Sequence, residues 1–512
     1  MDSVLAIDCG TQSIRAIIFD AKGNLIAKVK KSFEPYFSKE PGWGEQDPKL
    51  YWDSLCFICK TLKEQHPLEW DKIIAVSLTT QRDTCVLLDK EGKVLRPAIL
   101  WLDQRMAECK TPMSKLHNFM ISVGGVKEQV LATRKKFKAN WIRENQPEIW
   151  EKTDKYIFLS GYLIYKLTGN FVDSVASQIG HIPLDHKNRK WASKKDIKSA
   201  VCDIERDKLV KLVEPTEILG IISKKVSEET GINEGLKLIA SGSDKGCETL
   251  GVGCLDYSVG NISLGSTATI QTTVKDYFEP IRFFPSYATV IPNHFNPEVQ
   301  IYRGYWMISW FKKEFASKEV AMAKDANVSA EELLNKLLDE VPAGSHGLVL
   351  QPLWGSGIRK PYAKGAIIGF SDVHTRTHIY RAIIEGIGFA LLEGIEAIEK
   401  KTKHKMERIA ISGGGSQSDA ICQITADIFN REAYRVQTYE TSGLGAAITA
   451  FVGIGFYKSF DDAVKEMVHR VDVFKPNSKN VEIYSKLYKK VYKNIFPKLK
   501  GLYSEIREIT KY

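Results

Sequence analysis

Short apolar runs that alternate with polar turn residues open the chain. Residues 4–7 and 14–19 are apolar, and the segment DCGTQS between them is polar. Apolar runs of this length, bounded by glycine and hydroxyl residues, are typical of β-strands joined by a tight turn. We therefore predict that the N-terminus forms a β-meander that continues to Phe33.

The rest of the chain mixes helical periodicity with further short apolar runs. The pattern predicts strands over residues 73–78, 85–88, 236–240, 259–264, 268–274, 408–412 and 434–436. It predicts helices over residues 51–62, 137–145, 156–168, 195–201, 204–211, 305–316, 330–340, 376–401, 418–429 and 446–455. From residue 481, apolar side chains recur at the spacing of one helix face and lysines occupy the other, so we expect a helix that docks on the protein. Together these elements indicate an α/β fold.

A second copy of the opening pattern follows near the middle of the chain. In ISLGSTATIQTTVKD, as in AIDCGTQSIRAIIFD, a strand runs into glycine and hydroxyl residues and then returns as a strand. Gly10 and Gly265 are separated by about half of the 512 residues. The economical interpretation is an internal duplication that produced two α/β domains of similar plan. A chance match of two hairpins fits these residues equally well.

Composition and charge narrow the class of protein. Hydrophobic residues at 44% and charged residues at 26% exclude disordered and collagen-like chains. The chain has 72 Lys and Arg against 62 Asp and Glu, which suits an anionic ligand, but it has no basic block typical of nucleic-acid binding. Nine scattered cysteines predict reduced thiols in a cytoplasmic protein. Neither a signal peptide nor a membrane span is expected, because no apolar run approaches roughly 20 residues.

The two glycine–hydroxyl turns are candidate phosphate sites. Backbone N–H and side-chain O–H groups of such a turn converge on a concavity that suits phosphate oxygens. One turn is weak evidence, because any tight turn favours Gly, Ser and Thr. Two turns in equivalent places of two domains could hold a polyphosphate from both sides. Asp8 adds a carboxylate beside the first turn, where Mg²⁺ could bridge phosphates, although capping of the turn is an alternative role.

Three more polar segments follow predicted strands. Asp244, in SGSDKG, could take a proton from a substrate hydroxyl group, but a helix N-cap is at least as good an interpretation. Arg82 and Asp83 offer a donor and an acceptor that suit a molecule with several hydroxyl groups, whereas a surface salt bridge is the alternative. The three glycines after Ser412 would let a flat group approach the backbone, or they serve packing alone. Neither a P-loop nor a dinucleotide fingerprint is present in the sequence.

Taken in order, these segments resemble the FGGY family of carbohydrate kinases, in the fold superfamily of actin, Hsp70 and hexokinase. The likeness covers roughly residues 3–500 and is carried by AIDCGTQSIRAIIFD, PGWGEQDP, LTTQRDT, LWLDQR, KGAIIGFSDVHTRTHIYRAIIEG and SGGGSQSDAICQITADIF. The resemblance implies two duplicated actin- and hexokinase-like (ribonuclease H-like) α/β domains around a nucleotide cleft. We expect a sugar-binding domain at residues 1–246 and an ATP-binding domain at residues 247–512.

The resemblance also implies a reaction and its residues. The reaction is phosphorylation by ATP, with Mg²⁺, of a hydroxyl group on a small ketose, polyol, glycerol-like molecule or sugar acid. By position in the motifs, Asp244 would be the catalytic base and Asp8 would support the metal. The substrate would lie against Gln81, Arg82, Asp83 and Asp244. The nucleotide would lie against Gly10, Thr11, Gln12, Ser13, Gly265, Ser266, Thr267, Gly414 and Ser418.

The identity of the substrate stays open at this point. Glycerol kinases carry Arg-Glu where this chain has Arg82 and Asp83, xylulose kinases carry Met-His there, and Thr133 stands near a tyrosine position of glycerol kinases. The Arg–acid pair favours a glycerol-like or polyol pocket, whereas PGWGEQDP and PAILWLDQR favour a xylulose kinase. The alternative function is a non-catalytic or chaperone-like nucleotide-binding protein of the same superfamily. The sequence leaves the assembly open, with a homodimer as one form.

Overall fold

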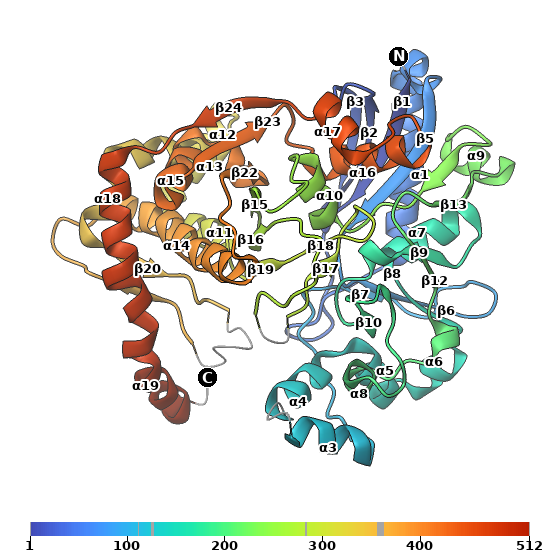
Figure 1. The fold of residues 1–512 in the computed structure, drawn as a ribbon, viewed down its shortest axis with the longest axis horizontal. Helices are drawn as coiled ribbons and strands as arrows, with labels where there is room; N and C mark the ends of the chain where they lie inside the picture. Colours follow the sequence, from blue (N-terminus) through green and yellow to red (C-terminus); the bar gives the residue numbers. More distant parts are fainter. Residues whose placement is uncertain (1, 111, 124–126, 282–283, 356–362, 511–512) are drawn as a thin grey trace.

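Two six-stranded mixed sheets form the centre of the molecule (Figure 1). The computed structural model describes residues 2–110, 112–123, 127–281, 284–355 and 363–510. The first sheet has the order β13 (Ile218–Ile221), β14 (Lys237–Ile239), β5 (Ile73–Thr80), β1 (Ser3–Cys9), β2 (Ser13–Asp20) and β3 (Leu25–Ser32). The second has the order β19 (Glu298–Ile301), β16 (Ala268–Gln271), β15 (Val259–Leu264), β22 (Arg408–Ser412), β23 (Glu432–Val436) and β24 (Arg470–Phe474).

The two sheets have the same topology. In the first, β1, β2 and β3 pair antiparallel in sequence order, and β1 also pairs parallel with β5, which pairs parallel with β14. In the second, β15, β16 and β19 repeat the antiparallel unit, and β22 and β23 repeat the parallel one. The hairpins β1–β2 and β15–β16 therefore occupy equivalent places. This repetition confirms the expected fold class of two duplicated α/β domains.

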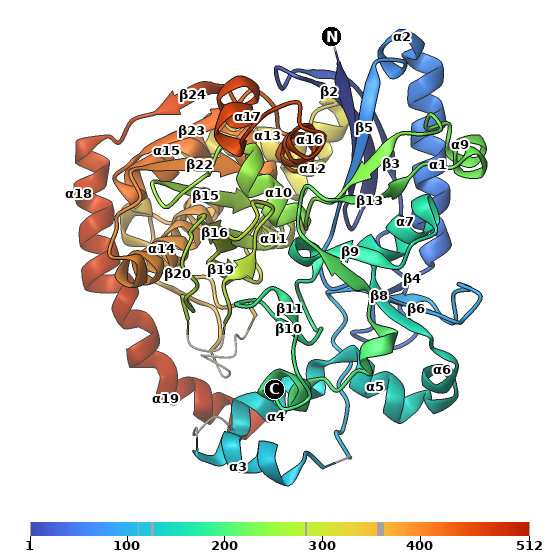
Figure 2. The same ribbon diagram turned by 45° about the vertical axis from the view of Figure 1, so that its right-hand side comes forward.

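Helices from both halves of the chain cover the first sheet. On one face, α1 (Pro48–Gln65) and α7 (Leu159–Thr168) bury a core with β1, β2 and β5. The other face is covered by α10 (Asp244–Gly251) and by α16 (Thr441–Gly453), which comes from near the C-terminus (Figures 1 and 2). The two helices pack so closely that a Cβ atom at Gly445 would lie 1.8 Å from the Cys247 carbonyl oxygen. Glycine is therefore required at this crossing.

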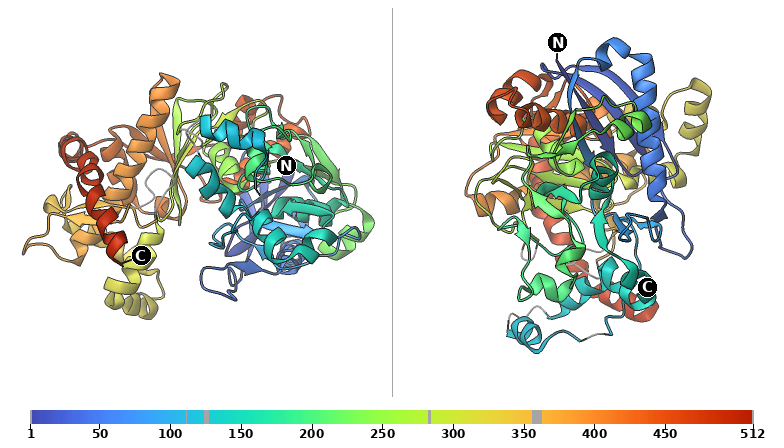
Figure 3. Two further views of the ribbon diagram at one scale, coloured as in Figure 1. Left: turned by 90° about the horizontal axis from the view of Figure 1, so that it is seen from below. Right: turned by 90° about the vertical axis from the view of Figure 1, so that its right-hand side faces the viewer.

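The second sheet packs against α14 (Arg376–Thr402), α11 (Trp306–Phe315) and α15 (Asp419–Phe429). The C-terminal α18 (Ser478–Leu487), a π-helical turn (Tyr488–Tyr492) and α19 (Lys493–Thr510) run along the outer side of this half (Figure 3). Tyr484, Tyr488, Tyr492 and Ile495 join the same core. The expected docking of the amphipathic C-terminal helix is thus confirmed.

One predicted helix is wrong, and another is right only from Leu159 onward. Residues 156–168 begin as the strand β8 (Lys155–Phe158), which pairs antiparallel with β6 (Cys85–Leu88) before α7 starts. The aromatic and β-branched side chains of this run suit a strand, and the pairing with β6 is a long-range effect. Residues 204–211 form a 3-10 turn (Arg206–Lys208) and then the strand β12 (Lys211–Val213), which pairs with β9 (Val172–Ser174).

The remaining elements complete the two halves. Among the described residues, no helix combines the length and the apolar character that crossing a bilayer would require. The further strands are β4 (Glu45–Gln46), β7 (Ala98–Ile99), β10 (Leu184–Asp185), β11 (Lys190–Trp191), β17 (Tyr287–Ala288), β18 (Phe295–Asn296), β20 (Val349–Gln351) and β21 (Ala366–Ile368). The further helices are α2 (Pro67–Trp70), α3 (Lys115–Val123), α4 (Lys127–Lys136), α5 (Lys138–Asn145), α6 (Pro147–Lys152), α8 (Ile197–Val201), α9 (Lys224–Thr230), α12 (Ser317–Ala326), α13 (Ala330–Lys336) and α17 (Phe460–Met467).

Candidate active site

The carboxyl ends of β1, β5 and β14 meet at one edge of the first sheet, because the three strands run parallel. The Gln81 backbone N–H donates to the Cys9 carbonyl oxygen at 2.9 Å, and Thr80 forms an isolated bridge with Ser243. Ligands of open α/β sheets bind beyond this edge. The first glycine turn, the segment 81–83 and Asp244 are therefore neighbours in the structure, although they are far apart in the sequence.

Asp244 is the first residue of α10 and is not its N-cap. Ser243 is the cap, since its hydroxyl group accepts from the Gly246 backbone N–H at 3.4 Å. The Asp244 side chain is 30% exposed, and its Oδ1 lies 3.9 Å from the Arg82 Nε. Burial raises the pKa of Asp244 above its ordinary value, against the opposing charges of Lys245 and Arg82. The result is a partly accessible carboxylate that is more basic than usual, as a general base requires.

Arg82 is largely but not fully buried, with 12% of its side chain exposed, and connects the two halves of the molecule. Its Nη1 donates to both carboxylate oxygens of Glu298, on β19, at 3.0 and 2.8 Å. Its Nε donates to the Ser243 hydroxyl group at 3.1 Å, and its guanidinium lies over the Tyr287 ring. Its Nη2 is buried and has no hydrogen-bond partner among the described residues. The alternative of a surface salt bridge is wrong for this residue, and its Nη2 group, with two N–H donors, is left without a partner among the described residues.

Asp83 is also buried, but its oxygens are already occupied. Oδ1 accepts from the His181 backbone N–H at 2.8 Å, and Oδ2 accepts from Lys138 Nζ at 2.7 Å and lies 2.6 Å from His181 Nδ1. Burial would raise the pKa of Asp83, but the charges of His181 and Lys138 outweigh it and hold the pKa well below its usual range. A Cβ atom at Gly180, whose φ is +139°, would lie 2.5 Å from the Asp83 Cβ, so this approach requires glycine.

His181 is a candidate site residue that no motif of the sequence indicates. Its side chain is 28% exposed, and its ring is held by Asp83 and by an edge contact with Phe137. The ring position Nε2 makes no hydrogen bond to a described residue. No local pattern in the sequence connects Lys138, His181 or Glu298 with the segment 81–83.

The first glycine turn contacts Trp101 and Gln81. The Gly10 N–H donates to the Ser13 carbonyl oxygen at 3.0 Å, and Trp101 Nε1 donates to the Thr11 hydroxyl oxygen at 3.0 Å. The Thr11 hydroxyl group donates to Gln81 Oε1 at 2.8 Å, while the Gln81 amide donates to the Tyr51 hydroxyl oxygen at 3.2 Å. Gln81 therefore supports the turn. The Gln12 side chain is exposed next to it.

Asp8 is buried within β1, so it does not cap the turn. Its Oδ2 accepts from Arg15 Nη1 at 2.9 Å, and Arg15 Nε lies 3.3 Å from a Glu440 oxygen. Burial, opposed by Arg15 and aided by the charges of Asp244 and Glu440, raises the pKa of Asp8 to about 6. No group of three or more His, Cys, Asp or Glu side chains among the described residues could hold a metal by itself. One carboxylate with phosphate oxygens and water is a usual Mg²⁺ environment, and Asp8 fits it.

The second glycine turn is tied to the start of α11. The carbonyl oxygens of Gly265 and Ser266 accept from the Tyr305 and Trp306 N–H groups at 3.0 and 3.3 Å. The Thr267 hydroxyl group donates to the Tyr302 carbonyl oxygen at 3.4 Å. These contacts fix the position of the turn, and Lys245 lies beside it, since a Cβ atom at Gly265 would be 3.9 Å from Lys245 Nζ.

The glycines after β22 differ from one another in their surroundings. Gly413 has a φ of +79°, and a Cβ atom there would lie 2.9 Å from the Leu264 backbone. A Cβ atom at Gly415 would press on the Tyr305 ring, whereas one at Gly414 would meet open space. Ser418 caps α15 by accepting from the Ile421 N–H at 3.4 Å. Gly414 is thus the position of this segment that leaves room for a flat group.

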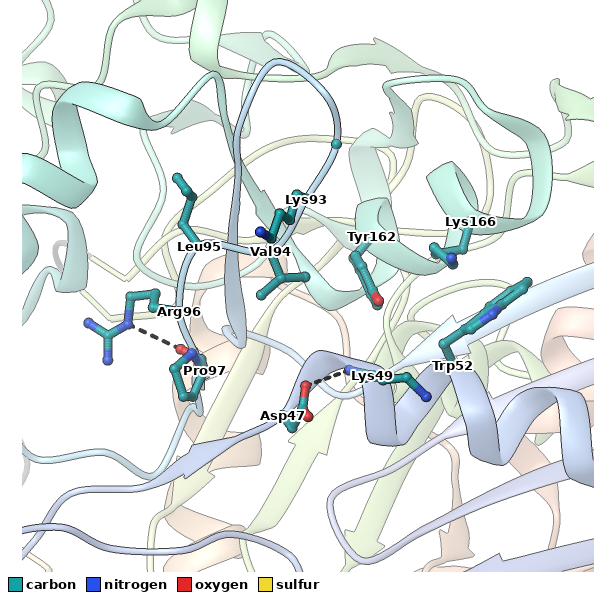
Figure 4. Close-up of a pocket in the computed structure, with 11 residues that line it drawn as sticks. Asp47, Lys49, Trp52, Lys93, Val94, Leu95, Arg96, Pro97, Tyr162 and Lys166 are labelled. Atoms are coloured by element: carbon teal, nitrogen blue, oxygen red, sulfur yellow. Dashed lines mark hydrogen bonds between the residues drawn. The ribbon is translucent and has the colours of Figure 1, made fainter.

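A pocket of about 550 Å³ lies apart from these residues, between the start of α1, α7 and the loop 92–97 (Figure 4). Lys166 lies over the Trp52 ring, and Asp47 accepts from the Lys49 N–H to cap α1. None of the residues named above for substrate or nucleotide lines this pocket.

Comparison with known proteins gives consistent matches over the whole chain. The profile of the FGGY family of carbohydrate kinases, N-terminal domain, matches residues 3–251, and the C-terminal profile matches residues 260–454. A xylulose kinase of Lactococcus lactis is 31% identical over 95% of each chain, and a glycerol kinase of Thermococcus gammatolerans is 29% identical over 95% of each. The fold is that of a ligand-bound xylulose kinase from Lactobacillus acidophilus, with a TM-score of 0.82 and 23% identity over 99% of this chain and 100% of the other. A Plasmodium falciparum glycerol kinase with ADP gives a TM-score of 0.74 at 20% identity over 97% and 98%.

Proposed function

This chain belongs to the FGGY family of carbohydrate kinases, and on that premise we propose that it phosphorylates a four- or five-carbon ketose or polyol. As a member of the family it is an ATP-dependent carbohydrate kinase. Such an enzyme must place a substrate hydroxyl group in line with the γ-phosphate and must stabilise the charge that spreads over the phosphoryl group.

The position of the Asp244 carboxylate is the observation that carries the proposal. It lies at the ligand edge of the first sheet, close to Arg82 on one side and followed by Lys245 on the other. Its raised pKa suits a group that accepts a proton from a hydroxyl group near neutral pH. In the proposed reaction, the substrate oxygen bonds to the γ-phosphorus, the bond from that phosphorus to the β–γ bridging oxygen breaks, and Asp244 takes the proton.

The proposed nucleotide site uses the two glycine turns. Gly10 to Ser13 and Gly265 to Thr267 would bind the phosphates, and Gly414 with Ser418 would lie against the nucleoside. Asp8 would hold Mg²⁺, in part through water, and the bound metal would neutralise part of the phosphate charge. The division into a sugar-binding domain at 1–246 and an ATP-binding domain at 247–512 is part of this proposal.

The proposed sugar site uses the Nη2 group of Arg82 and the ring of His181. Because both oxygens of Asp83 are occupied, Asp83 would act by holding His181 and Lys138 in place. The similarity to xylulose kinases over nearly the whole chain supports a ketose substrate. Arg82 and Asp83 stand where xylulose kinases carry Met-His. This difference favours a substrate that makes other contacts with the protein than xylulose does in those enzymes.

Initial rates of ADP formation at equal concentrations of xylulose, ribulose, erythritol, ribitol, gluconate and glycerol test the substrate. We expect a four- or five-carbon ketose or polyol to give the highest rate. A clear preference for glycerol or gluconate would refute this choice of substrate. Nucleotide binding without turnover on any of them would favour a non-catalytic nucleotide-binding protein.

Asp83→Ala is expected to raise the sugar KM about ten- to hundredfold and to leave the ATP KM nearly unchanged. Without the Asp83 carboxylate, the buried Lys138 ammonium has lost its partner and the His181 ring is no longer held. The free-energy cost of leaving such a group unpaired is about 1–3 kcal/mol. Steady-state kinetics with the best substrate measure the effect. Asp20→Ala is the matched control, since Asp20 is an equally buried carboxylate that caps the β2–β3 turn. Equal changes in both KM values would contradict the assignment to the sugar site.

Two further expectations belong to this proposal. The cytoplasmic location is supported by the nine cysteines, all of which are free thiols. The homodimer stays a prediction, which light scattering of the purified protein would test.

A further inference from the structure

Lys245, which follows Asp244 in α10, contacts Glu248 and Ser263 and has no role in the reaction proposed above. Its Nζ donates to Glu248 Oε2 at 2.8 Å and to the Ser263 hydroxyl oxygen. The Ser263 hydroxyl group in turn donates to Glu248 Oε1 at 2.9 Å. The three side chains thus form a closed network between α10 and β15, and the Lys245 side chain remains 20% exposed.

This network lies at the base of the second glycine turn. Ser263 is the next-to-last residue of β15, and Gly265 follows that strand directly. A Cβ atom at Gly265 would lie 3.9 Å from Lys245 Nζ. An ammonium group has three N–H donors. Two of them are engaged by Glu248 and Ser263, so the third is available on the side of the turn.

The charges around Lys245 keep it a cation. Burial would lower its pKa, but the carboxylates of Glu248 and Asp244 outweigh burial and the opposing charge of Arg82, and the pKa is raised. Asp244, the proposed base, precedes Lys245 directly in α10. A fixed positive charge therefore lies between the base and the second glycine turn, which is where a phosphoryl group would be in transit.

We propose that Lys245 is a catalytic residue whose ammonium group binds the γ-phosphate of ATP and stabilises its charge during transfer. Preorganised cations of this kind act in other phosphoryl-transfer enzymes because little reorganisation is needed when charge develops. The ammonium keeps its protons throughout, since the substrate proton goes to Asp244. Glu248 and Ser263 are positioning residues that hold the Lys245 side chain. The proposal rests on the kinase activity for turnover but can be tested by binding alone.

The proposal is tested by measuring the Kd of AMP-PNP and, separately, the Kd of ADP for the full-length Lys245→Met variant. With Mg²⁺ present, calorimetry should show the Kd of the non-transferable analogue AMP-PNP raised about ten- to hundredfold, as expected for loss of a charged hydrogen bond. The Kd of ADP, which has no γ-phosphate, should change by less than about threefold. With the best substrate, kcat should fall about a hundredfold or more, and Lys245→Arg should recover part of the AMP-PNP affinity.

The controls separate this role from a structural one. Lys245→Met leaves the buried Glu248 carboxylate unpaired, so the double variant Lys245→Met with Glu248→Gln removes that charge as well. The double variant should show the same selective loss of AMP-PNP affinity. Lys63→Met, which removes a partly buried lysine of α1 bound to the Gly231 carbonyl oxygen, should change neither Kd. Equal weakening of ADP and AMP-PNP, or wild-type selectivity in the double variant, would overturn the proposal. A selective binding loss in a protein with no sugar-dependent turnover would instead refute the kinase reaction while supporting the contact.

Discussion

Asp244→Asn is expected to lower kcat at least about a hundredfold, the lower end of what a general base contributes. The amide oxygen of Asn can still accept the Lys245 N–H hydrogen bond, which Asp244 Oδ1 accepts at 2.8 Å. The side chain can no longer take up a proton. Because Ser243 caps α10, the helix should remain intact. Calorimetry with Mg²⁺–ADP should therefore show nearly unchanged nucleotide affinity.

Asp20→Asn is the matched control for this substitution. Asp20 accepts hydrogen bonds from two backbone N–H groups of a turn, at the far end of β2 from the first glycine turn. It should lose stability without losing kcat. In the wild type, the raised pKa of Asp244 also moves the acid limb of the kcat–pH profile above the range of an ordinary Asp. An Asp244→Asn enzyme with wild-type kcat would contradict the assignment of the base.

Asp8→Asn is expected to abolish measurable turnover, because the neutral amide cannot support Mg²⁺ beside the phosphates. The melting temperature near pH 8 should be at least as high as that of the wild type. The folded-state pKa of Asp8 is about 6, above the ordinary aspartate pKa of 3.8, so the carboxylate costs stability when ionised. A shift of this size corresponds to roughly 3 kcal/mol, of which the lost hydrogen bond to Arg15 offsets a part.

The sign of this pH dependence is testable. The stability contributed by a raised Asp pKa is fully present below pH 3.8 and is lost as the pH rises through about 6. The wild type should lose this increment between pH 4 and 7, and Asp8→Asn should not. Wild-type activity should fall below pH 6 as Asp8 takes up a proton. Denaturant unfolding across this range, with Asp20→Asn as control, measures the difference. Retained activity with a large loss of stability would make Asp8 a structural residue.

The elements that were predicted correctly are those whose pattern lies within a few neighbouring residues of the sequence. The hairpins around Gly10 and Gly265 were predicted because short apolar runs flank turn residues in both. The strand β8 was missed because KYIF continues without a break into an apolar helix, and only its pairing with β6 distinguishes it. Elements with a clear local pattern were therefore predicted correctly. The strand that is defined only by its pairing with a distant strand was not.

The candidate site divides in the same way. Asp244 and Asp8 were identified by their place after or beside strands, and the structure removes the capping alternative for both. Glu298 lies 216 positions from Arg82, and His181 lies 98 positions from Asp83. Nothing near these residues in the sequence indicates their partners, because each contact arises from how the strands and loops are arranged in space. Predicted roles that depend on ATP, such as those of Gly414 and Ser418, stay predictions.

The packing of α16 on the first sheet has a consequence for how the protein is made. Val4, Ile17 and Phe19 are covered by Leu444 and Phe451, which leave the ribosome more than four hundred residues after the strands that they cover. At 5–20 residues per second, the roughly 190 residues between α10 and α16 take about 10–40 s to synthesise. During that time one face of the nascent sheet is apolar and exposed, which makes it a natural substrate for chaperones. A chain truncated before residue 441 should therefore aggregate, even though it contains every strand of the first sheet.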